Sequence, residues 1–330
     1  MPERRSSRDA LALGPVKRLL GVNVDGWLVA GAAPSHYSRF VSDGDLAKLV
    51  SWRLPHVRLP VDGALTAAEG WRALDDAIGR CLRQSLTVTL ALRLDDHGAL
   101  FASPDGWRAT AEWWRAVAAR YRDSGVRFDL LDEPQPPASV SEEALSALGS
   151  PRLSAAAARR APLPGAVEGR AWSALAGRLT AAIREVAPDA PLVVQPAGGV
   201  PEAFAHLRPT RDARTGYGFH AFSPQALTRR GEGTYPGEVA GERWDRERLR
   251  ATLEPALAFG RAHEAPVEVV AFGITRAAPR QSRLTWTRSL LSLCRSEGMG
   301  WCYWTLRHPE FGLVVEAGVD YDLLGVLQSE

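Results

Sequence analysis

Short apolar runs rich in β-branched residues alternate along this chain with longer amphipathic stretches. Apolar runs of this kind are typical of buried parallel strands, and a helical apolar period is typical of helices that cover a sheet. We expect eight strands, at residues 19–24, 56–61, 86–94, 126–131, 191–195, 216–222, 267–272 and 300–305. We expect helices near residues 44–52, 67–83, 106–124, 170–186, 244–262 and 282–296, and only a short helix near 201–205. Eight strands with right-handed helical crossovers close most naturally into a barrel.

The length of the chain is compatible with a single domain. Its 330 residues could form two average domains, but one (β/α)8 TIM barrel of the α/β class commonly takes this length. We expect an N-terminal extension at residues 1–18 and one barrel at residues 19–330. Residues 135–168, rich in Pro, Ala and Ser, are too long for an ordinary connection. They form either a lid over the barrel mouth or a surface insertion without function.

The charge balance argues against nucleic acid and anionic membranes as partners. Forty lysines and arginines balance 38 acidic residues, which gives a net charge of +2, and the basic residues are spread through the predicted helices. A nucleic-acid surface normally gathers its basic residues in one stripe. The chain lacks a run of about 20 apolar residues, so we expect no membrane span. The sequence leaves the oligomeric state open.

The cysteines and the N-terminus bear on the cellular compartment. Cys81, Cys294 and Cys302 lack metal-ligand or redox spacing, and an odd number does not suit a disulfide framework. Residues 1–18 carry several arginines but no apolar stretch of roughly 7–15 residues before a small-residue cleavage site. We therefore expect a cytoplasmic protein with buried thiols. Since the His and Asp residues also lack metal-ligand spacing, we expect no metal, and we expect no organic cofactor.

Polar and aromatic residues gather where the predicted strands end. The chain reads Val-Asn-Val-Asp-Gly-Trp from Val22, Val-Arg-Leu-Pro from Val57, Asp-Asp-His-Gly from Asp95, Asp-Glu-Pro from Asp132, His-Ala-Phe from His220 and Trp-Cys-Tyr-Trp from Trp301. In this order, and at these strand ends, the six segments resemble glycoside hydrolase family 5, the cellulase family. The resemblance runs from about residue 19 to the C-terminus. It implies a (β/α)8 barrel with its active site at the C-terminal ends of the strands.

The resemblance also implies a role for individual residues. Glu133 matches the general acid/base of the family, and Asp132 stands where the family has an asparagine that reaches the nucleophile and the sugar. Ala271, in Val-Glu-Val-Val-Ala-Phe-Gly, stands where the family has its nucleophilic carboxylate. The expected catalytic residues are thus Glu133 and Asp132. The expected substrate-binding residues are Asn23, Trp27, Arg58, His97, His220, Phe222 and Trp304.

The alanine at 271 conflicts with the chemistry of a retaining glycosidase. That chemistry needs two carboxylates roughly 5 Å apart, one to protonate the leaving oxygen and one to attack the anomeric carbon. Glu268 is three residues earlier in the same strand, so strand alternation predicts that it faces the helices or solvent and cannot substitute. Phe222 replaces the tyrosine that would hydrogen-bond the nucleophile. An introduced alanine would explain position 271 alone, whereas the joint changes at Phe222 and Asp132 favour natural divergence.

Three functions remain open from the sequence. The first is an intracellular enzyme that uses Glu133 for acid/base chemistry on a small biosynthetic or sugar-like molecule, since a positioned acid/base alone typically gives 10²–10⁴ in rate. The second is a retaining β-glycosidase that carries an introduced alanine at the nucleophile position. The third is a non-catalytic barrel that binds a carbohydrate or a partner protein. In each of the first two the expected ligand is a small molecule or a saccharide.

Overall fold

Eight parallel strands close into a barrel in the computed structural model, which describes residues 19–65, 68–148 and 165–329. The strands follow chain order around the barrel: β1 Leu20–Asn23, β2 His56–Asp62, β3 Thr87–Arg93, β4 Arg127–Asp129, β5 Leu192–Val194, β6 Thr215–Ala221, β9 Val267–Phe272 and β10 Trp301–Tyr303. Parallel pairing of β10 with β1 completes the ring. Each strand coincides with a predicted apolar run, so the predicted (β/α)8 fold is confirmed.

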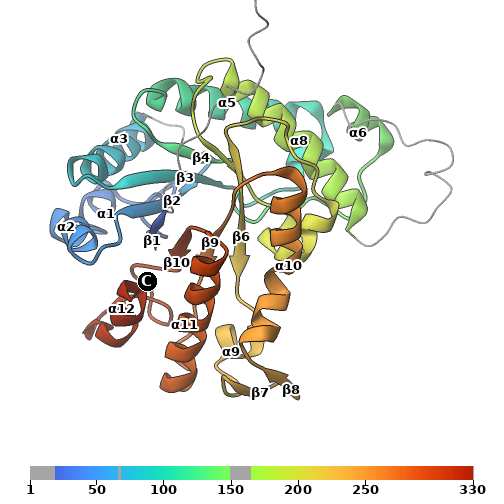
Figure 1. The fold of residues 1–330 in the computed structure, drawn as a ribbon. Helices are drawn as coiled ribbons and strands as arrows, with labels where there is room; N and C mark the ends of the chain where they lie inside the picture. The colour runs from blue at the N-terminus through green and yellow to red at the C-terminus, as the bar shows by residue number, and fades with distance from the viewer. Residues whose placement is uncertain (1–18, 66–67, 149–164, 330) are drawn as a thin grey trace, which may run out of the picture.

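Helices surround this barrel (Figure 1). The longer ones are α2 Asp43–Ser51, α3 Ala68–Arg83, α5 Pro104–Tyr121, α8 Ala166–Arg184, α10 Arg246–His263, α11 Arg280–Ser296 and α12 Tyr321–Gln328. Short helices α1 Pro34–Arg39 and α4 Ala99–Ala102 lie in the connections. The connection between β5 and β6 contains the 3-10 helices η1 Ala197–Gly199 and η2 Pro201–His206, where the sequence indicates only a short helix.

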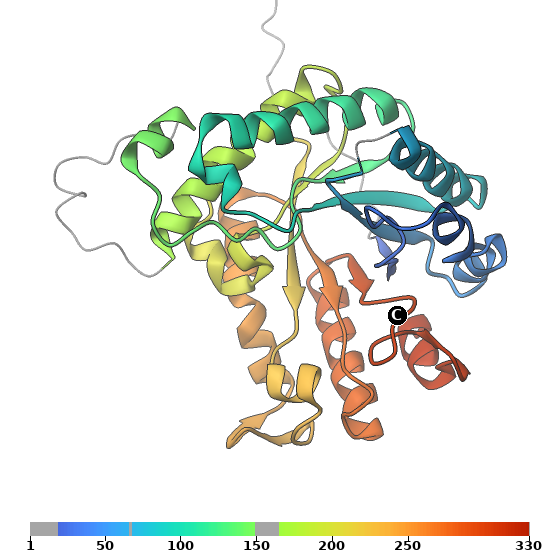
Figure 2. The same cartoon turned by 180° about the vertical axis from the view of Figure 1, so that it is seen from behind.

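Two additions extend the loops at the C-terminal ends of the strands. Helix α9 Gln225–Arg230 and the antiparallel strands β7 Gly237–Val239 and β8 Glu242–Trp244 lie beyond the arrowhead of β6 (Figures 1 and 2). A second antiparallel pair, β11 Val314–Val315 and β12 Gly318–Val319, precedes α12. The first addition brings α9 next to the strand end that carries His220.

The predicted insertion at 135–168 is described only in part. Its first residues lead to α6 Glu142–Ala147, which packs against α8 on the outside of the barrel (Figure 2). The carbonyl of Leu148 accepts a hydrogen bond from Nε of Arg178 on α8 at 3.0 Å. Residues 149–164, and the predicted extension at 1–18, lie outside the described residues. The lid therefore stays a prediction.

Three buried tryptophans fix the loops that follow β4, β5 and β6. Trp114 on α5, Trp172 on α8 and Trp286 on α11 are each 0 % exposed. Their indole N–H groups donate at 2.6–3.1 Å to backbone carbonyls of Leu130, Gln195 and Ser223, respectively. A buried indole needs such an acceptor, so packing the helix also positions the loop. The helix layer thereby sets the geometry of the strand ends.

A β-bulge in β9 changes the direction of its side chains. Between the partners of Phe219 and His220 on β6, strand β9 contains one extra residue, Val270. Simple alternation fails across such a bulge. Glu268 therefore reaches across the barrel, and its Oε1 lies 2.8 Å from Nη2 of Arg127 on β4, which is not a neighbour of β9. The expectation that Glu268 faces the helices or solvent is wrong.

Within the described ranges, no helix is both long and apolar enough to cross a bilayer.

The three cysteines are buried, as the sequence predicts. Burial raises the pKa of the Cys81 and Cys302 thiols to about 12. These thiols are therefore protonated near neutral pH and are poor nucleophiles.

Candidate active site

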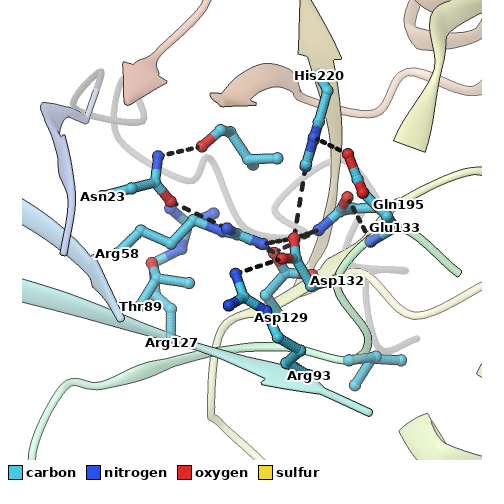
Figure 3. A network of polar contacts seen from close by, with 12 residues as sticks. Asn23, Arg58, Thr89, Arg93, Arg127, Asp129, Asp132, Glu133, Gln195 and His220 are labelled. Atoms are coloured by element: carbon cyan, nitrogen blue, oxygen red, sulfur yellow. Dashed lines mark hydrogen bonds and ion pairs between the residues drawn. The ribbon is translucent and has the colours of Figure 1, made fainter. Parts of the chain in front are cut away.

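Arg58 lies at the centre of a buried charge cluster inside the barrel (Figure 3). Its side chain on β2 is 1 % exposed, and Nη2 lies 2.7 Å from Oδ2 of Asp129 and 2.5 Å from Oδ1 of Asp132. Its Nη1 donates to Oδ1 of Asn23 at 3.0 Å. Burial opposes the charge, but the two carboxylates outweigh burial and raise the pKa of Arg58. The guanidinium is thus a fixed positive charge beneath the site.

Asn23 connects this cluster to the bulge in β9. Its amide N–H donates to the carbonyl of Val270 at 2.9 Å, while its oxygen accepts from Arg58. The side chain is 0 % exposed. Asn23 therefore supports Arg58 and β9 from inside the barrel and has no surface for a ligand, which differs from the substrate-binding role expected from the sequence.

Sequence reasoning misses two members of the cluster. Asp129 on β4 is 0 % exposed, and the amide of Gln195, directly after β5, donates to its Oδ2 at 2.8 Å. Burial raises the pKa of Asp129 to about 6, although Arg58 opposes this shift. The sequence does contain one feature that could have identified Asp129, because it is the one carboxylate within the apolar run 126–131. A charge in such a run needs a buried partner.

Glu133, His220 and Asp132 form a chain of contacts that leads from this cluster to solvent (Figure 3). Nδ1 of His220 lies 2.8 Å from Oε1 of Glu133, and Nε2 lies 3.4 Å from Oδ1 of Asp132. The side chains of Asp132 and His220 are 8 % and 7 % exposed, whereas that of Glu133 is 40 % exposed. Glu133 is therefore the member of the three that a ligand can reach.

These contacts set the protonation states. The hydrogen bond from His220 lowers the pKa of Glu133, and it outweighs the opposing effect of partial burial. Burial alone would lower the pKa of His220, but its contacts with Asp132 and Glu133 raise it. Burial likewise opposes ionisation of Asp132, yet the charge of Arg58 and the contact with His220 hold its pKa well below the usual range. Both directions favour an ionised Glu133 beside a protonated His220.

A glycine loop after β5 holds Glu133 in position. Glu133 has a φ of 46°, in the left-handed region, and its backbone N–H donates to Oε1 of Gln195 at 3.3 Å. Gly199, with a φ of 66°, lies so close that a Cβ there would stand 3.3 Å from Cγ of Glu133 and 3.3 Å from Cδ2 of His220. Glycine suits both this conformation and this limited space. Gly199 is a positioning residue that the sequence does not reveal.

Arg93, at the end of β3, lies between the acidic residues and Trp304. Its Nη1 lies 2.6 Å from Oδ1 of Asp25, and its Nη2 lies 3.6 Å from Oδ2 of Asp132. Its Cζ is 6.0 Å from the ring centroid of Trp304, within the range of a cation–π contact. Trp304 is partly exposed directly after β10, as expected for an aromatic platform at the mouth.

The remaining predicted residues fall into two groups. His97 lies near the mouth, where its Nδ1 accepts from the backbone N–H of Gln135 at 2.8 Å and burial lowers its pKa. Phe222 directly follows β6, with its ring centroid 6.2 Å from that of His220. Trp27, in contrast, is 0 % exposed, and its indole N–H donates to a backbone carbonyl of α1. The structure places Trp27 in the core, away from the other site residues.

Ala271 pairs with His220 across the neighbouring strands β9 and β6 and is 0 % exposed. It brings a methyl group to the strand end beside the Glu133–His220 contact. The described part of the chain contains no group of three or more His, Cys, Asp or Glu side chains arranged to hold a metal. Glu133 is the exposed carboxylate of this cluster, and the buried ring of His220 lies directly beside it.

Comparison with known proteins decides the family. The sequence model of the cellulase family, glycosyl hydrolase family 5, matches residues 34–309. The chain belongs to glycoside hydrolase family 5. Endoglucanase C of Acetivibrio thermocellus is 22 % identical to this family 5 chain over 371 residues, a span of 93 % of this chain and 97 % of the relative. The resemblance carried by the six strand-end segments is thus confirmed at the level of the family.

Solved structures share the family 5 barrel. Thermotoga maritima Cel5A, determined in complex with cellobiose, aligns with a TM-score of 0.73 at 19 % identity, over 94 % of this chain and 97 % of that one. Cellulose synthase subunit Z of Clostridioides difficile aligns with a TM-score of 0.74 at 18 % identity, over 94 % of this chain and 99 % of that one. Identities this low establish the fold, so the chemistry has to be argued from the residues of this family 5 member.

Proposed function

We propose that this family 5 barrel is an enzyme that moves protons on a small, sugar-like molecule through Glu133 and forms no glycosyl-enzyme intermediate. The observation that carries the proposal is the contact between Glu133 and His220 beside Ala271. A carboxylate that is partly exposed and ionised can accept a proton from a bound molecule. A methyl group in the position of the nucleophile cannot form a covalent bond to sugar.

Asp132 and Glu268 are poor substitutes for the second carboxylate of a retaining mechanism. Asp132 is the nearest carboxylate to Glu133 in the chain, but it is 8 % exposed and is held by Arg58 and His220. Glu268 is paired with Arg127 on the far side of the barrel interior. A nucleophile must approach the anomeric carbon freely, and both side chains are already paired with arginines.

The protonation state of Glu133 separates this site from that of a retaining glycosidase. The acid of such an enzyme starts protonated, and a neighbouring carboxylate is one of the influences that raise its pKa. With alanine at 271 that influence is absent, and His220 lowers the pKa of Glu133 instead. Glu133 therefore begins the reaction as a base.

A proton-transfer cycle follows from this state. Glu133 takes a proton from an O–H or C–H group of the substrate and returns it to another substrate atom or to a departing oxygen. His220 stabilises the carboxylate before the transfer through the contact of its Nδ1 with Glu133. Asp132 keeps His220 charged, and Arg58 keeps Asp132 ionised. Isomerisation, dehydration and cyclisation all fit this balance of protons.

The proposal is tested by following small molecules of the source cells. A metabolite extract is incubated with the wild-type protein, with Glu133→Gln and with Glu202→Gln, whose exposed side chain lies on η2. Mass spectrometry should show compounds that the wild-type protein and E202Q convert alike, and that E133Q converts at least about 100-fold more slowly. Equal conversion by E133Q would overturn the proposal.

A further inference from the structure

Arg229 on α9 is an exposed cation at the edge of the site with no ionic partner in the described part of the chain. Its Cζ lies 4.6 Å from the ring centroid of Phe222, and among the described residues it makes no ion pair and no hydrogen bond. Its neighbour Arg230 is bound through Nε to Glu232 at 3.0 Å. Two adjacent arginines of one short helix thus differ: one is neutralised locally and the other is not.

The position of Arg229 relates it to the reacting group. Phe222, on which it stacks, directly follows β6 and has its ring 6.2 Å from that of His220, which contacts Glu133. The charge of Arg229 also contributes, after the larger effect of His220, to the lowered pKa of Glu133. Helix α9 lies beyond the C-terminal end of β6 (Figure 1), and Glu133 follows the C-terminal end of β4, so Arg229 and Glu133 belong to loops at the same end of the barrel.

The stacking geometry prepares Arg229 for an anion. A guanidinium that lies over an aromatic ring keeps its N–H groups at the edge, where they can form two parallel hydrogen bonds to a carboxylate or a phosphoryl group. The ring also limits the freedom of the side chain, so less entropy is lost when a ligand binds. Phe222 has no hydroxyl that would compete for these donors.

The charge balance at the strand ends agrees with this reading. Strand β9 pairs His220 with Ala271, so an uncharged methyl group stands where the family resemblance places a carboxylate. A ligand with a negative charge would meet repulsion from a carboxylate at this position and meets none from alanine. Arg58 and Arg93 are already paired with Asp129, Asp132 and Asp25, which leaves Arg229 as the candidate partner among the site arginines.

We propose that the substrate carries an oxyanion group, either a carboxylate or a phosphate ester. This group binds to the guanidinium of Arg229, which lies over the ring of Phe222. The inference rests on the proposed function, since it assigns a ligand class to the same small-molecule site. An anionic substrate would also explain why position 271 has no carboxylate. A neutral polysaccharide is compatible with a carboxylate there, whereas an anionic substrate would be repelled by it. Arg229 is then a specificity-determining residue of the family 5 scaffold in this chain.

The test compares charged and neutral sugars by isothermal titration calorimetry. The probes are D-glucuronate, D-glucose 6-phosphate and D-glucose, and the proteins are wild type, Arg229→Gln and the matched control Arg230→Gln. We expect at least one acid to bind about 10-fold or more tightly than glucose, and R229Q but not R230Q to lose that difference, as for a charge-assisted hydrogen-bonded pair. The tighter acid identifies the oxyanion as carboxylate or phosphate.

Several results would overturn the inference. Glucose could bind as tightly as both acids, R229Q and R230Q could bind the acids alike, or neither acid could bind at millimolar concentration. Equal melting temperatures of R229Q and wild type would exclude misfolding as the cause of any change in binding. We expect equal melting temperatures because Arg229 is exposed. Glu133→Gln separates this inference from the proposed function: an active E133Q contradicts proton transfer by Glu133 and leaves an Arg229-dependent acid affinity standing.

Discussion

Nδ1 of His220 lies 2.8 Å from Oε1 of Glu133, and this contact couples the charges of the two side chains. It lowers the pKa of Glu133, whereas the acid of a retaining glycosidase works with a raised pKa. In the neighbouring strand β9, Ala271 is the register partner of His220. This arrangement supports the proposal that Glu133 accepts a proton before it donates one.

The contact predicts a pH window for stability. The pKa of Glu133 is lowered from 4.5, so its contribution is present above pH 4.5 and is lost as the pH falls through the lowered value. The pKa of His220 is raised from 6.5, so its contribution is complete below pH 6.5 and is lost as the pH rises through the raised value. Urea unfolding of wild type and His220→Gln should differ most between these limits. A difference that keeps growing well above pH 6.5 would contradict the assignment.

Removal of Arg58 should destabilise the fold strongly. Arg58→Met leaves the buried carboxylates of Asp129 and Asp132 without their main partner, and breaking a buried ion pair typically costs about 3–5 kcal/mol. Arg230→Gln, which removes an exposed pair, should change the free energy of unfolding little. Chemical denaturation at neutral pH measures both. The difference in free energy of unfolding between wild type and R58M should shrink at acidic pH, where the two carboxylates become protonated. A difference that stays constant would show that the unpaired carboxylates are not the cause.

An alanine at Gly199 should disturb the Glu133–His220 contact. The new Cβ would stand 3.1–3.3 Å from Gln195, Glu133 and His220, on a backbone with φ of 66°. Gly298 has a similar φ of 70° but no atom within 4 Å of a built Cβ, so Gly298→Ala reports the backbone strain alone. We expect G199A to be less stable than G298A by about 1–2 kcal/mol and to shift the His220 ring resonances in NMR spectra. Equal stability and unshifted resonances would show that the loop adapts.

A carboxylate restored at position 271 alone should not restore glycoside hydrolysis. The new carboxylate of Ala271→Glu would have no tyrosine hydroxyl as a hydrogen-bond donor, because residue 222 is a phenylalanine. The negative charge of Asp132 would also repel this carboxylate. Release of nitrophenol from an aryl β-cellobioside is therefore expected to stay near background for A271E, with or without azide. Strong hydrolysis by A271E, or azide rescue of the wild-type chain, would instead favour a retaining glycosidase with an introduced alanine.

Trp304 allows the non-catalytic alternative to be tested. A barrel that only binds saccharide would bind cellobiose in calorimetry, lose that binding in Trp304→Ala, and convert no compound of the cell extract. The proposed enzyme should convert a compound with the wild-type protein, and W304A should weaken binding of that compound, since aromatic platforms typically contribute about 1 kcal/mol beyond buried area. Conversion that depends on Glu133 excludes a purely binding role.

The periodicity of apolar residues predicted all eight barrel strands because parallel strands are buried on both faces and so appear as short apolar runs. The order of strand-end segments predicted that Arg58, Asp132, Glu133 and His220 would lie together. It could not predict the bulge at Val270, which arises from packing between strands and turned Glu268 into the barrel. Nor could it place Trp27 in the core, since a tryptophan directly after a strand can lie either in the core or at the barrel mouth.

Residues that act through contacts from other elements were missed for the same reason. Gln195 and Gly199 come from the connection after β5, Arg229 comes from the connection after β6, and none carries a motif of its own. Only the closed barrel brings the loops after β4, β5 and β6 together, with the indole groups of the outer helices fixing each loop.

Covalent trapping tests the central claim most directly. A fluorinated aryl β-cellobioside forms a long-lived glycosyl-enzyme adduct with any retaining glycosidase that accepts it, and intact-protein mass spectrometry detects that adduct. We predict that the wild-type chain keeps its unmodified mass after prolonged incubation, while a retaining β-glucanase in a parallel reaction gains the mass of one fluorinated cellobiosyl group. A wild-type chain that gains the same mass would show that another side chain acts as the nucleophile and would contradict the account.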